Sequence, residues 1–180
     1  MLPLLLLSAC GPGHAVSELA PKAASPEQIV LLRDAVAAEQ NACINVVTRD
    51  PHGLPFASAK VWIVDTTAKT GGRFIYASDP GFQEMSARHE RAAEAHSGAI
   101  RLAAIPPGAG SSFVEPGAAP QSCGTITTFY TPMIDGDMAF VTVETSNRTR
   151  LLSSGVTVFA RRGGAWQVIA SNHELEGPII

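Results

Sequence analysis

The sequence has few charged residues, few aromatic residues and only three cysteines. Charged residues make up 16% of its 180 positions and aromatic residues 6%, whereas hydrophobic residues make up 46%. The formal net charge is −3, and no run of like charges is longer than two residues. This charge pattern lacks the basic face that binding to nucleic acid or to an anionic membrane surface requires. We therefore expect no nucleic-acid partner.

A long hydrophobic run is also missing. The most apolar stretch, LPLLLL at positions 2–7, is far shorter than the roughly 20 apolar residues that a membrane-spanning helix needs. A short apolar segment at the N-terminus, followed by small residues, is typical of a signal peptide. The alternatives are an ordinary secretory signal without lipid attachment and an apolar terminus that packs on the folded domain.

The end of this segment, Leu7-Ser8-Ala9-Cys10, resembles the bacterial lipobox. The resemblance implies that residues 1–9 are removed and that the Cys10 thiol carries a diacylglyceryl group, with palmitate-like acyl chains as a membrane anchor. Gly11, in place of an aspartate, implies the outer membrane. The segment departs from the family pattern because residues 1–3 contain no lysine or arginine. We expect a periplasm-facing protein of the bacterial envelope, with residues 10–25 as a flexible, lipidated tether.

Two further cysteines, Cys43 and Cys123, lie in the body of the chain. In an oxidising compartment such a pair tends to form a disulfide, and the alternative is two separate buried thiols. Neither cysteine has a CxxC or CxxH spacing, so the pattern predicts no metal site. The sequence contains no cofactor motif that survives inspection, and we expect no cofactor.

Two segments have the pattern of helices. Ser25, Pro26 and Gln28 form a helix start with a capping box, and apolar residues at helical spacing extend the prediction to about residue 42. Residues 82–97 carry the second apolar stripe. Between them, the β-branched and aromatic runs 60–65 and 73–77 predict a hairpin. Residues 106–122 have the composition of a long loop.

The C-terminal third predicts four strands, at 124–131, 138–144, 155–161 and 165–171, joined by short turns. Asp135-Gly136 is the predicted turn between the first two of these strands. Three sets of alternating apolar residues each share a face: Ala139, Val141 and Val143; Val156, Val158 and Ala160; Trp166, Val168 and Ala170. We therefore expect a single α+β domain over 26–180, in which an antiparallel sheet ends in a four-stranded meander. Two helices would pack on it, both covering one face.

The last part of this pattern, FARRGGAWQVIASNHE at 159–174, resembles the final hairpin of nuclear transport factor 2-like and SnoaL-like domains. Gly163, Gly164, Trp166 and His173 are the residues that carry the resemblance. It implies a cone-shaped sheet around an apolar pocket. The extra sequence at 43–58 and the loop at 106–122 depart from the family pattern, and this fold hosts enzymes, binding proteins and inert scaffolds alike.

Few residues qualify as catalytic candidates. Neither His89-Glu90 nor His173-Glu174 is followed by the second histidine of an HExxH motif. His89 and His96 share a helix stripe two turns apart, so they cannot chelate one metal, and we expect them at the boundary between helix and sheet. In a cone-shaped domain, Glu144 and His173 near the strand ends would be the acid–base candidates.

The sequence therefore favours a lipid-anchored envelope protein that acts as a binding or interaction module, with an envelope protein as a partner. The first alternative is a small-molecule-binding or isomerase-like enzyme with an apolar cone. The second alternative is a structural lipoprotein that stabilises an envelope complex.

Overall fold

The computed structural model describes residues 20–57, 59–65, 70–96, 98–120, 122–147 and 149–175, of which 173–175 are described by their backbone alone. The predicted signal peptide, Cys10 and most of the predicted tether lie outside these ranges. The last part of the predicted tether is described, and there Lys22–Ala23 pairs in parallel with Ile100–Arg101. Regular pairing thus begins before the predicted tether boundary at residue 25.

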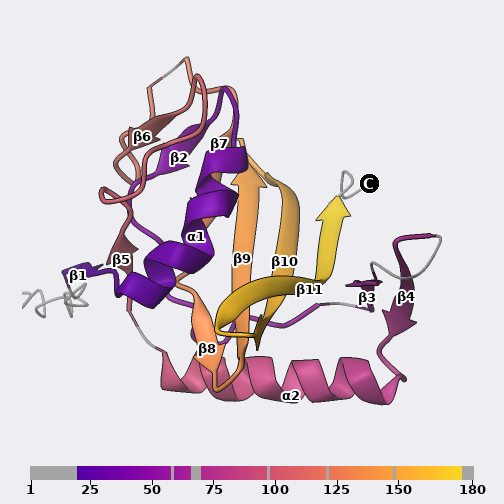
Figure 1. Ribbon diagram of the computed structural model, residues 1–180. Helices are drawn as coiled ribbons and strands as arrows, with labels where there is room; N and C mark the ends of the chain where they lie inside the picture. The colour runs from indigo at the N-terminus through magenta and orange to yellow at the C-terminus, as the bar shows by residue number, and fades with distance from the viewer. Residues whose placement is uncertain are drawn as a thin grey trace, which may run out of the picture.

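The described chain forms two helices and eleven strands (Figure 1). In chain order they are β1 Lys22–Ala23, α1 Pro26–Ala38, β2 Cys43–Asn45, β3 Lys60–Val64, β4 Gly72–Tyr76, α2 Pro80–Ala95, β5 Ile100–Arg101, β6 Ser112–Val114, β7 Ile126–Phe129, β8 Met133–Asp135, β9 Met138–Ser146, β10 Leu151–Arg162 and β11 Ala165–Leu175. The α+β class predicted from the sequence is confirmed.

Nine of these strands form the main sheet, in the order β4-β3-β11-β10-β9-β7-β2-β6, with β8 paired to β9. The predicted meander is confirmed, because β7, β9, β10 and β11 are successive antiparallel neighbours. At one end the sheet is mixed, since β2 pairs in parallel with both β6 and β7. The three-residue strand β6 lies inside the predicted loop at 106–122. The sequence did not predict this strand, because the segment is rich in glycine and proline.

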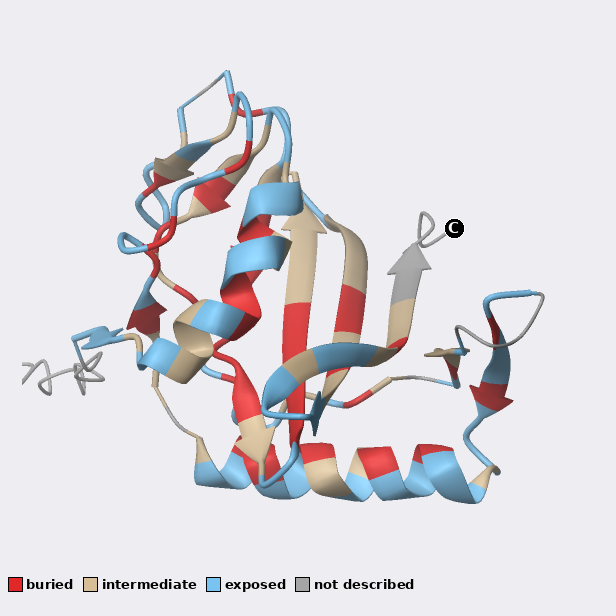
Figure 2. Ribbon diagram, in the orientation of Figure 1, coloured by how far each residue is buried: buried red, intermediate tan, exposed pale blue. Residues whose placement is uncertain are grey.

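The helices cover opposite faces of the sheet, so the prediction that both cover one face is wrong. Strand β9 shows this directly, because successive side chains of a strand point to opposite faces. Ala139 and Val141 belong to a core cluster with Leu32 and Val36 of α1, whereas Met138 and Phe140 belong to a second cluster that includes residues of α2. Figure 2 shows the buried stripe of α1 turned toward the sheet.

Strand β11 contains a bulge that changes one predicted face. Val158 pairs with Ala170, but the next residue of β10, Phe159, pairs with Val168. The extra residue shifts the alternation. Trp166 consequently packs with the α1 cluster, and Ala170 with the α2 cluster. The prediction that these two residues share a face is therefore wrong.

The start of α1 has the predicted capping geometry. The Ser25 hydroxyl accepts a hydrogen bond from the backbone N–H of Gln28 at 3.2 Å, and the Ser25 N–H donates to the Gln28 side chain at 3.0 Å. These bonds satisfy backbone groups that a helix start otherwise leaves unpaired. The helix ends at Ala38, four residues earlier than predicted.

Arginines of α2 hold the helix against the β8–β9 turn. The Arg88 side chain donates to Asp135 at 3.1 Å and to Asp137 at 2.6 Å, and Arg91 donates to Asp135 at 2.8 Å. The hydrogen bond and charge of Arg88 lower the pKa of Asp137 from its usual value. The Asp135-Gly136 turn predicted from the sequence is thereby tied to the helix.

His89 is fully buried in the α2 cluster, which corrects the expected position at the helix boundary. Its exposed fraction is 0%, and its ring contacts those of Phe56 and Phe140 at centroid distances of 5.4 and 5.1 Å. Neither ring nitrogen has a hydrogen-bond partner among the described residues. Burial lowers the pKa of His89 to about 4, so the ring is neutral at pH 7.

Cys43 and Cys123, which are 80 positions apart in the sequence, form a disulfide with a Cα–Cα distance of 5.8 Å. Cys43 begins β2, and Cys123 lies in the connection between β6 and β7. The bond therefore ties the parallel end of the sheet to the β6–β7 connection, one residue after the predicted loop at 106–122.

We predict that the buried His89 makes the fold sensitive to acid. In the unfolded chain His89 is protonated below about pH 6.5, whereas in the native chain its pKa is lowered to about 4. Stability is therefore lost as pH falls through this window, by up to about 3 kcal/mol. His89→Leu removes this loss in urea unfolding at pH 7 and pH 4.5, whereas the exposed His52→Gln retains it. Equal acid loss in wild type and His89→Leu would contradict the assignment.

We also predict that the disulfide is a major source of stability. In the chain-entropy model, closing a loop of about 80 residues contributes roughly 4–5 kcal/mol. The double variant Cys43→Ser/Cys123→Ser should have a free energy of unfolding several kcal/mol below that of wild type. A reductant should destabilise wild type and leave the double variant unchanged. An unchanged urea midpoint in the double variant, or free-thiol labelling of the native protein without reductant, would show that the bond does not form.

Candidate ligand-binding site

The sheet has one end that the helices cover less completely. Along β9, residues 138–142 are buried, whereas residues 143–146 are half-buried (Figure 2). The second half of β9 and its neighbours carry mainly polar side chains. We call this region the polar end and define it by Asn45, Thr128, Glu144 and Ser154. Thr128 and Ser154 pair with Glu144 from either side in the sheet register.

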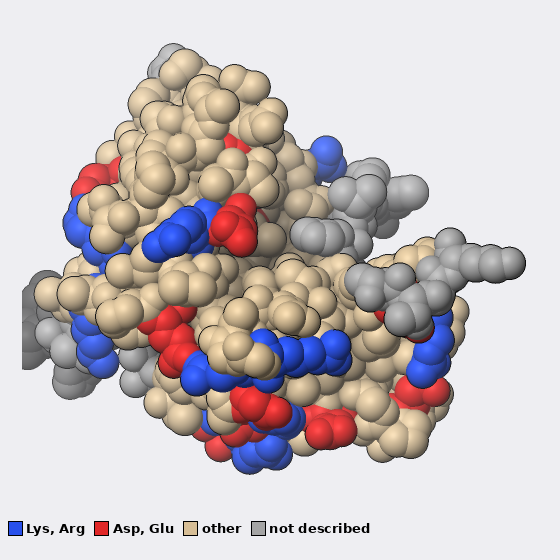
Figure 3. All heavy atoms as spheres, viewed as in Figure 1, with Lys and Arg blue, Asp and Glu red and all other residues tan. Residues whose placement is uncertain are grey.

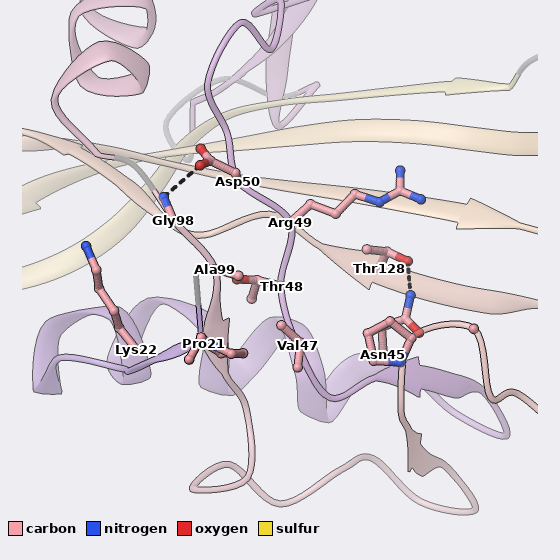
Figure 4. A pocket seen from close by; sticks show the side chains of 13 residues that line it. Pro21, Lys22, Asn45, Val47, Thr48, Arg49, Asp50, Gly98, Ala99 and Thr128 are labelled. Atoms are coloured by element: carbon pink, nitrogen blue, oxygen red, sulfur yellow. Dashed lines mark hydrogen bonds between the residues drawn. The ribbon is translucent and has the colours of Figure 1, made fainter. Parts of the chain in front are cut away.

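A cavity of about 800 Å³ opens beside the polar end (Figure 4). This volume lies within the usual range for small-molecule sites. Its walls come from the first described residues, the connection after β2, the segment before β5 and the turn after β6. Side chains that give it polar character are Lys22, Asn45, Thr48, Arg49, Asp50 and Thr128. Val47, Ala99 and Pro116 contribute apolar surface.

Hydrogen bonds fix the wall of this cavity, the larger of the two described here. Asp50 accepts from the backbone N–H groups of His52 at 2.9 Å and Gly98 at 2.8 Å. The Thr48 hydroxyl lies 2.6 Å from that of Thr131 and accepts from the N–H of Ile100 at 2.9 Å. These contacts join three segments that are distant in sequence, so the cavity is preformed by the fold.

Asn45 and Thr128 form a second fixed contact in the same wall. The Asn45 amide donates to the Thr128 hydroxyl at 2.6 Å, as Figure 4 shows. In that view, the Arg49 side chain extends away from Lys22 and Asp50. The cationic side chains of Lys22 and Arg49 therefore lie at different sides of the cavity.

Arg49, Tyr130 and Glu144 form a charged network at the edge of the larger cavity. The Arg49 guanidinium donates to Glu144 at 2.6 Å, and the Tyr130 hydroxyl donates to the other carboxylate oxygen at 2.9 Å. The Arg49 side chain is 56% exposed and that of Glu144 only 14%. Burial raises the pKa of Tyr130 against the lowering effect of Arg49, and Glu144 raises it further. The phenol therefore stays protonated and acts as a donor.

A smaller cavity of about 270 Å³ lies on the other side of this network. Glu144 lines it together with Thr142, Ser154 and Asn172, whereas Arg49 lines only the larger cavity. Leu54, Pro55, Phe56 and Ala57 supply an apolar wall. The Arg49–Glu144 ion pair thus separates two cavities of different size.

In the sheet register, the two predicted acid–base candidates lie opposite neighbouring residues of β10. Glu144 pairs with Ser154 across the β9–β10 ladder, whereas the backbone of His173 pairs with Gly155. The side chain of His173 lies outside the described part of the structure. Glu144 lines the smaller cavity, and both of its oxygens already accept hydrogen bonds. This arrangement suits a fixed binding group better than a free base.

Sequence reasoning missed Arg49, Tyr130 and the threonines of the polar end. Arg49 lies in a connection that meets Tyr130 only through an isolated parallel bridge, and no local spacing relates the two. The run TITTFYT at 125–131 carries the one available signal, because threonines at buried strand positions require polar partners.

Within the described ranges, no cluster of three or more metal-ligating side chains is present, and no helix is long and apolar enough to cross a bilayer. On the face shown in Figure 3, acidic and basic side chains of described residues are interspersed. No protein-family model, no curated protein and no solved structure matches this chain.

Proposed function

We propose that this chain is a lipid-anchored protein of the bacterial envelope whose periplasm-facing domain binds a small molecule in the larger cavity. The lipobox at residues 7–10 supports the anchor, and Gly11 supports its place in the outer membrane. The cavity supports binding as the activity, because it is large, preformed and lined by both apolar and polar groups. An envelope protein partner remains compatible with this role, and no reaction is assigned.

One observation carries the proposal: the larger cavity lies where the chain enters the domain. Ala20, Pro21 and Lys22 line it, and β1 holds them there through the bond from Lys22 N–H to the Ala99 carbonyl at 2.9 Å. A fully extended chain of ten residues spans at most roughly 35 Å. A lipid on Cys10 would therefore keep the cavity mouth within that distance of the membrane.

Binding fits the geometry better than acid–base catalysis. The Glu144 carboxylate is held by Arg49 and Tyr130, and Asp50 accepts two backbone N–H bonds. Groups fixed in this way recognise a ligand without reorganisation, which lowers the cost of binding. The nuclear transport factor 2-like enzyme therefore remains the second choice.

The lipid anchor is tested by Cys10→Ser in the full sequence expressed in a bacterial host. We expect wild type to fractionate with the outer membrane and its mass to include a lipid. Cys10→Ser should lose both properties, whereas Cys123→Ser should keep the lipid. A wild-type protein without lipid mass, or a Cys10→Ser variant that stays in the membrane, would refute the anchor.

The larger cavity is tested with anilinonaphthalene sulfonate, an amphipathic fluorescent probe. We expect saturable binding at one site in wild type. Ala99→Trp places an indole in the cavity and should weaken binding at least about tenfold, a loss of roughly 1.4 kcal/mol. Ala87→Trp, at an exposed position of α2, should bind like wild type. Binding that Ala99→Trp leaves unchanged would exclude this cavity as the site.

A further inference from the structure

Strand β4 forms an edge of the main sheet. It stands at one end of the strand order, next to β3, and Figure 1 shows it at the end of the molecule opposite β1. The edge of a sheet presents backbone N–H and C=O groups on which another strand can pair. The groups that β4 leaves open therefore decide what can bind there.

The pairing with β3 shows which residues of β4 turn their backbone groups to the free edge. Just after β4, the N–H of Ala77 donates to the Ala59 carbonyl at 2.9 Å. Bonded and non-bonded pairs alternate along an antiparallel ladder, so every second residue of β4 points its N–H and C=O away from β3. These outward residues are Gly72, Phe74 and Tyr76.

Two of the three outward residues are already engaged by their neighbours. The Tyr76 N–H donates to the Asp79 carboxylate at 2.6 Å, and the Tyr76 carbonyl accepts from the Asp79 N–H at 2.8 Å. The Gly72 carbonyl accepts from the Thr70 hydroxyl at 2.7 Å. Within the described ranges, no hydrogen bond reaches the outward N–H or carbonyl of Phe74. Phe74 therefore offers the free edge both an open donor and an open acceptor.

The side chains beside this open residue form an exposed aromatic face. Phe74 is 45% and Tyr76 54% exposed, whereas Ile75 between them is buried in the α2 cluster. Trp62 pairs with Phe74 in the register, and their ring centroids are 4.9 Å apart. A Cβ on Gly72 would lie 2.8 Å from the Trp62 indole. The aromatic face therefore includes one position, Gly72, that has no side chain of its own.

We propose that β4 pairs with β4 of a second copy of this chain, antiparallel and centred on Phe74. The two Phe74 residues exchange both N–H···O bonds, which satisfies the open donor and acceptor of each copy. Tyr76 of one copy lies opposite Gly72 of the other, and its ring covers the glycine beside Trp62. An aromatic residue across from a glycine is a known way to stabilise a strand edge.

The engaged ends of β4 favour a second copy over an uninterrupted strand of another protein. Such a strand would direct an N–H at the Gly72 carbonyl and a carbonyl at the Tyr76 N–H, both of which are already bonded. In the paired copies these two groups face each other, and each is satisfied by its own chain. The remaining Gly72 N–H faces the Tyr76 carbonyl of the other copy, which has a second acceptor position. The edge is thus self-complementary about a two-fold axis.

The contact is small, so we expect weak association in solution. A five-residue edge buries far less than the roughly 1,000 Å² of a stable interface, and we expect a dissociation constant of the order of 100 μM. On the proposed anchor, two copies in one membrane have a high effective concentration. A two-fold axis along the membrane normal lets both anchors enter that membrane. No residue of β4 lines either cavity, so the pairing does not depend on ligand binding.

The test uses the full-length chain in neutral detergent, at concentrations from about tenfold below to tenfold above 100 μM. Sedimentation equilibrium measures the mass, and NMR measures hydrogen exchange of each backbone amide. We expect a monomer–dimer equilibrium in which the Phe74 amide exchanges at least about threefold more slowly at the highest concentration. The Tyr76 amide, which Asp79 already holds, should change little and serves as the internal reference.

Two matched variants test the contact. Phe74→Lys places two like charges directly opposite each other and should weaken association at least about tenfold. Val30→Lys makes a similar change at a position of α1 that is 50% exposed, and should leave the affinity within about twofold of wild type. Phe74→Pro removes the outward N–H, which β3 does not use, and should also abolish the dimer while the Ile75 amide stays protected.

A photoreactive benzophenone side chain in place of Phe74 identifies the occupant in native envelopes. We expect a crosslinked product of twice the mass of the chain. A crosslink to a different protein in its place would overturn the assignment to a second copy.

Three further results would overturn the pairing. These are a monomer at the highest concentration, a dimer that forms without slower exchange at Phe74, and a dimer that Phe74→Lys leaves at wild-type affinity. The second result would move the contact to another surface. Failure of the fluorescent probe to bind the larger cavity would leave these measurements unaffected.

Discussion

The burial of strand β9 on both of its faces is the constraint on which the rest of the structure depends. Its alternate residues serve two cores, one under α1 and one under α2. A strand in this position cannot shift by one residue without exchanging the two cores, so the register of its neighbours is fixed. Two strands away, β11 contains the bulge, and at the start of β9 ion pairs join α2 to the β8–β9 turn.

The same constraint creates the candidate binding region. Because both cores use the first half of β9, the second half extends beyond the main packing and carries Glu144 among half-buried polar residues. The connection after β2 crosses here and brings Arg49 to Glu144. One ion pair then divides the space into two cavities with different linings. The larger adjoins the first described residues of the chain, and Glu144 lines the smaller.

Local patterns predicted the elements well, because caps, turns and alternation act within a few residues. The Ser25 cap, the Asp135-Gly136 turn and the meander follow from such patterns. Local patterns did not predict that the helices cover opposite faces of the sheet. The burial of β9 on both faces appears in the sequence only as a continuous apolar run. Arg49 and Tyr130 were missed because their contact depends on a tertiary crossing. His89 was misplaced because its apolar ring surroundings come from Phe56 and Phe140, which are distant in sequence.

The central claim is our proposal that a lipid on Cys10 anchors the domain with its cavity-bearing end toward the membrane. Figure 1 places β1 and the β3–β4 hairpin at opposite ends of the molecule. The direct measurement is paramagnetic broadening of backbone amides in the lipidated protein, bound to vesicles that carry a spin-labelled headgroup lipid. The account predicts strong broadening at Lys22 and Ala99 and little at Phe74. Stronger broadening at Phe74 than at Lys22, or none at either position, would contradict it.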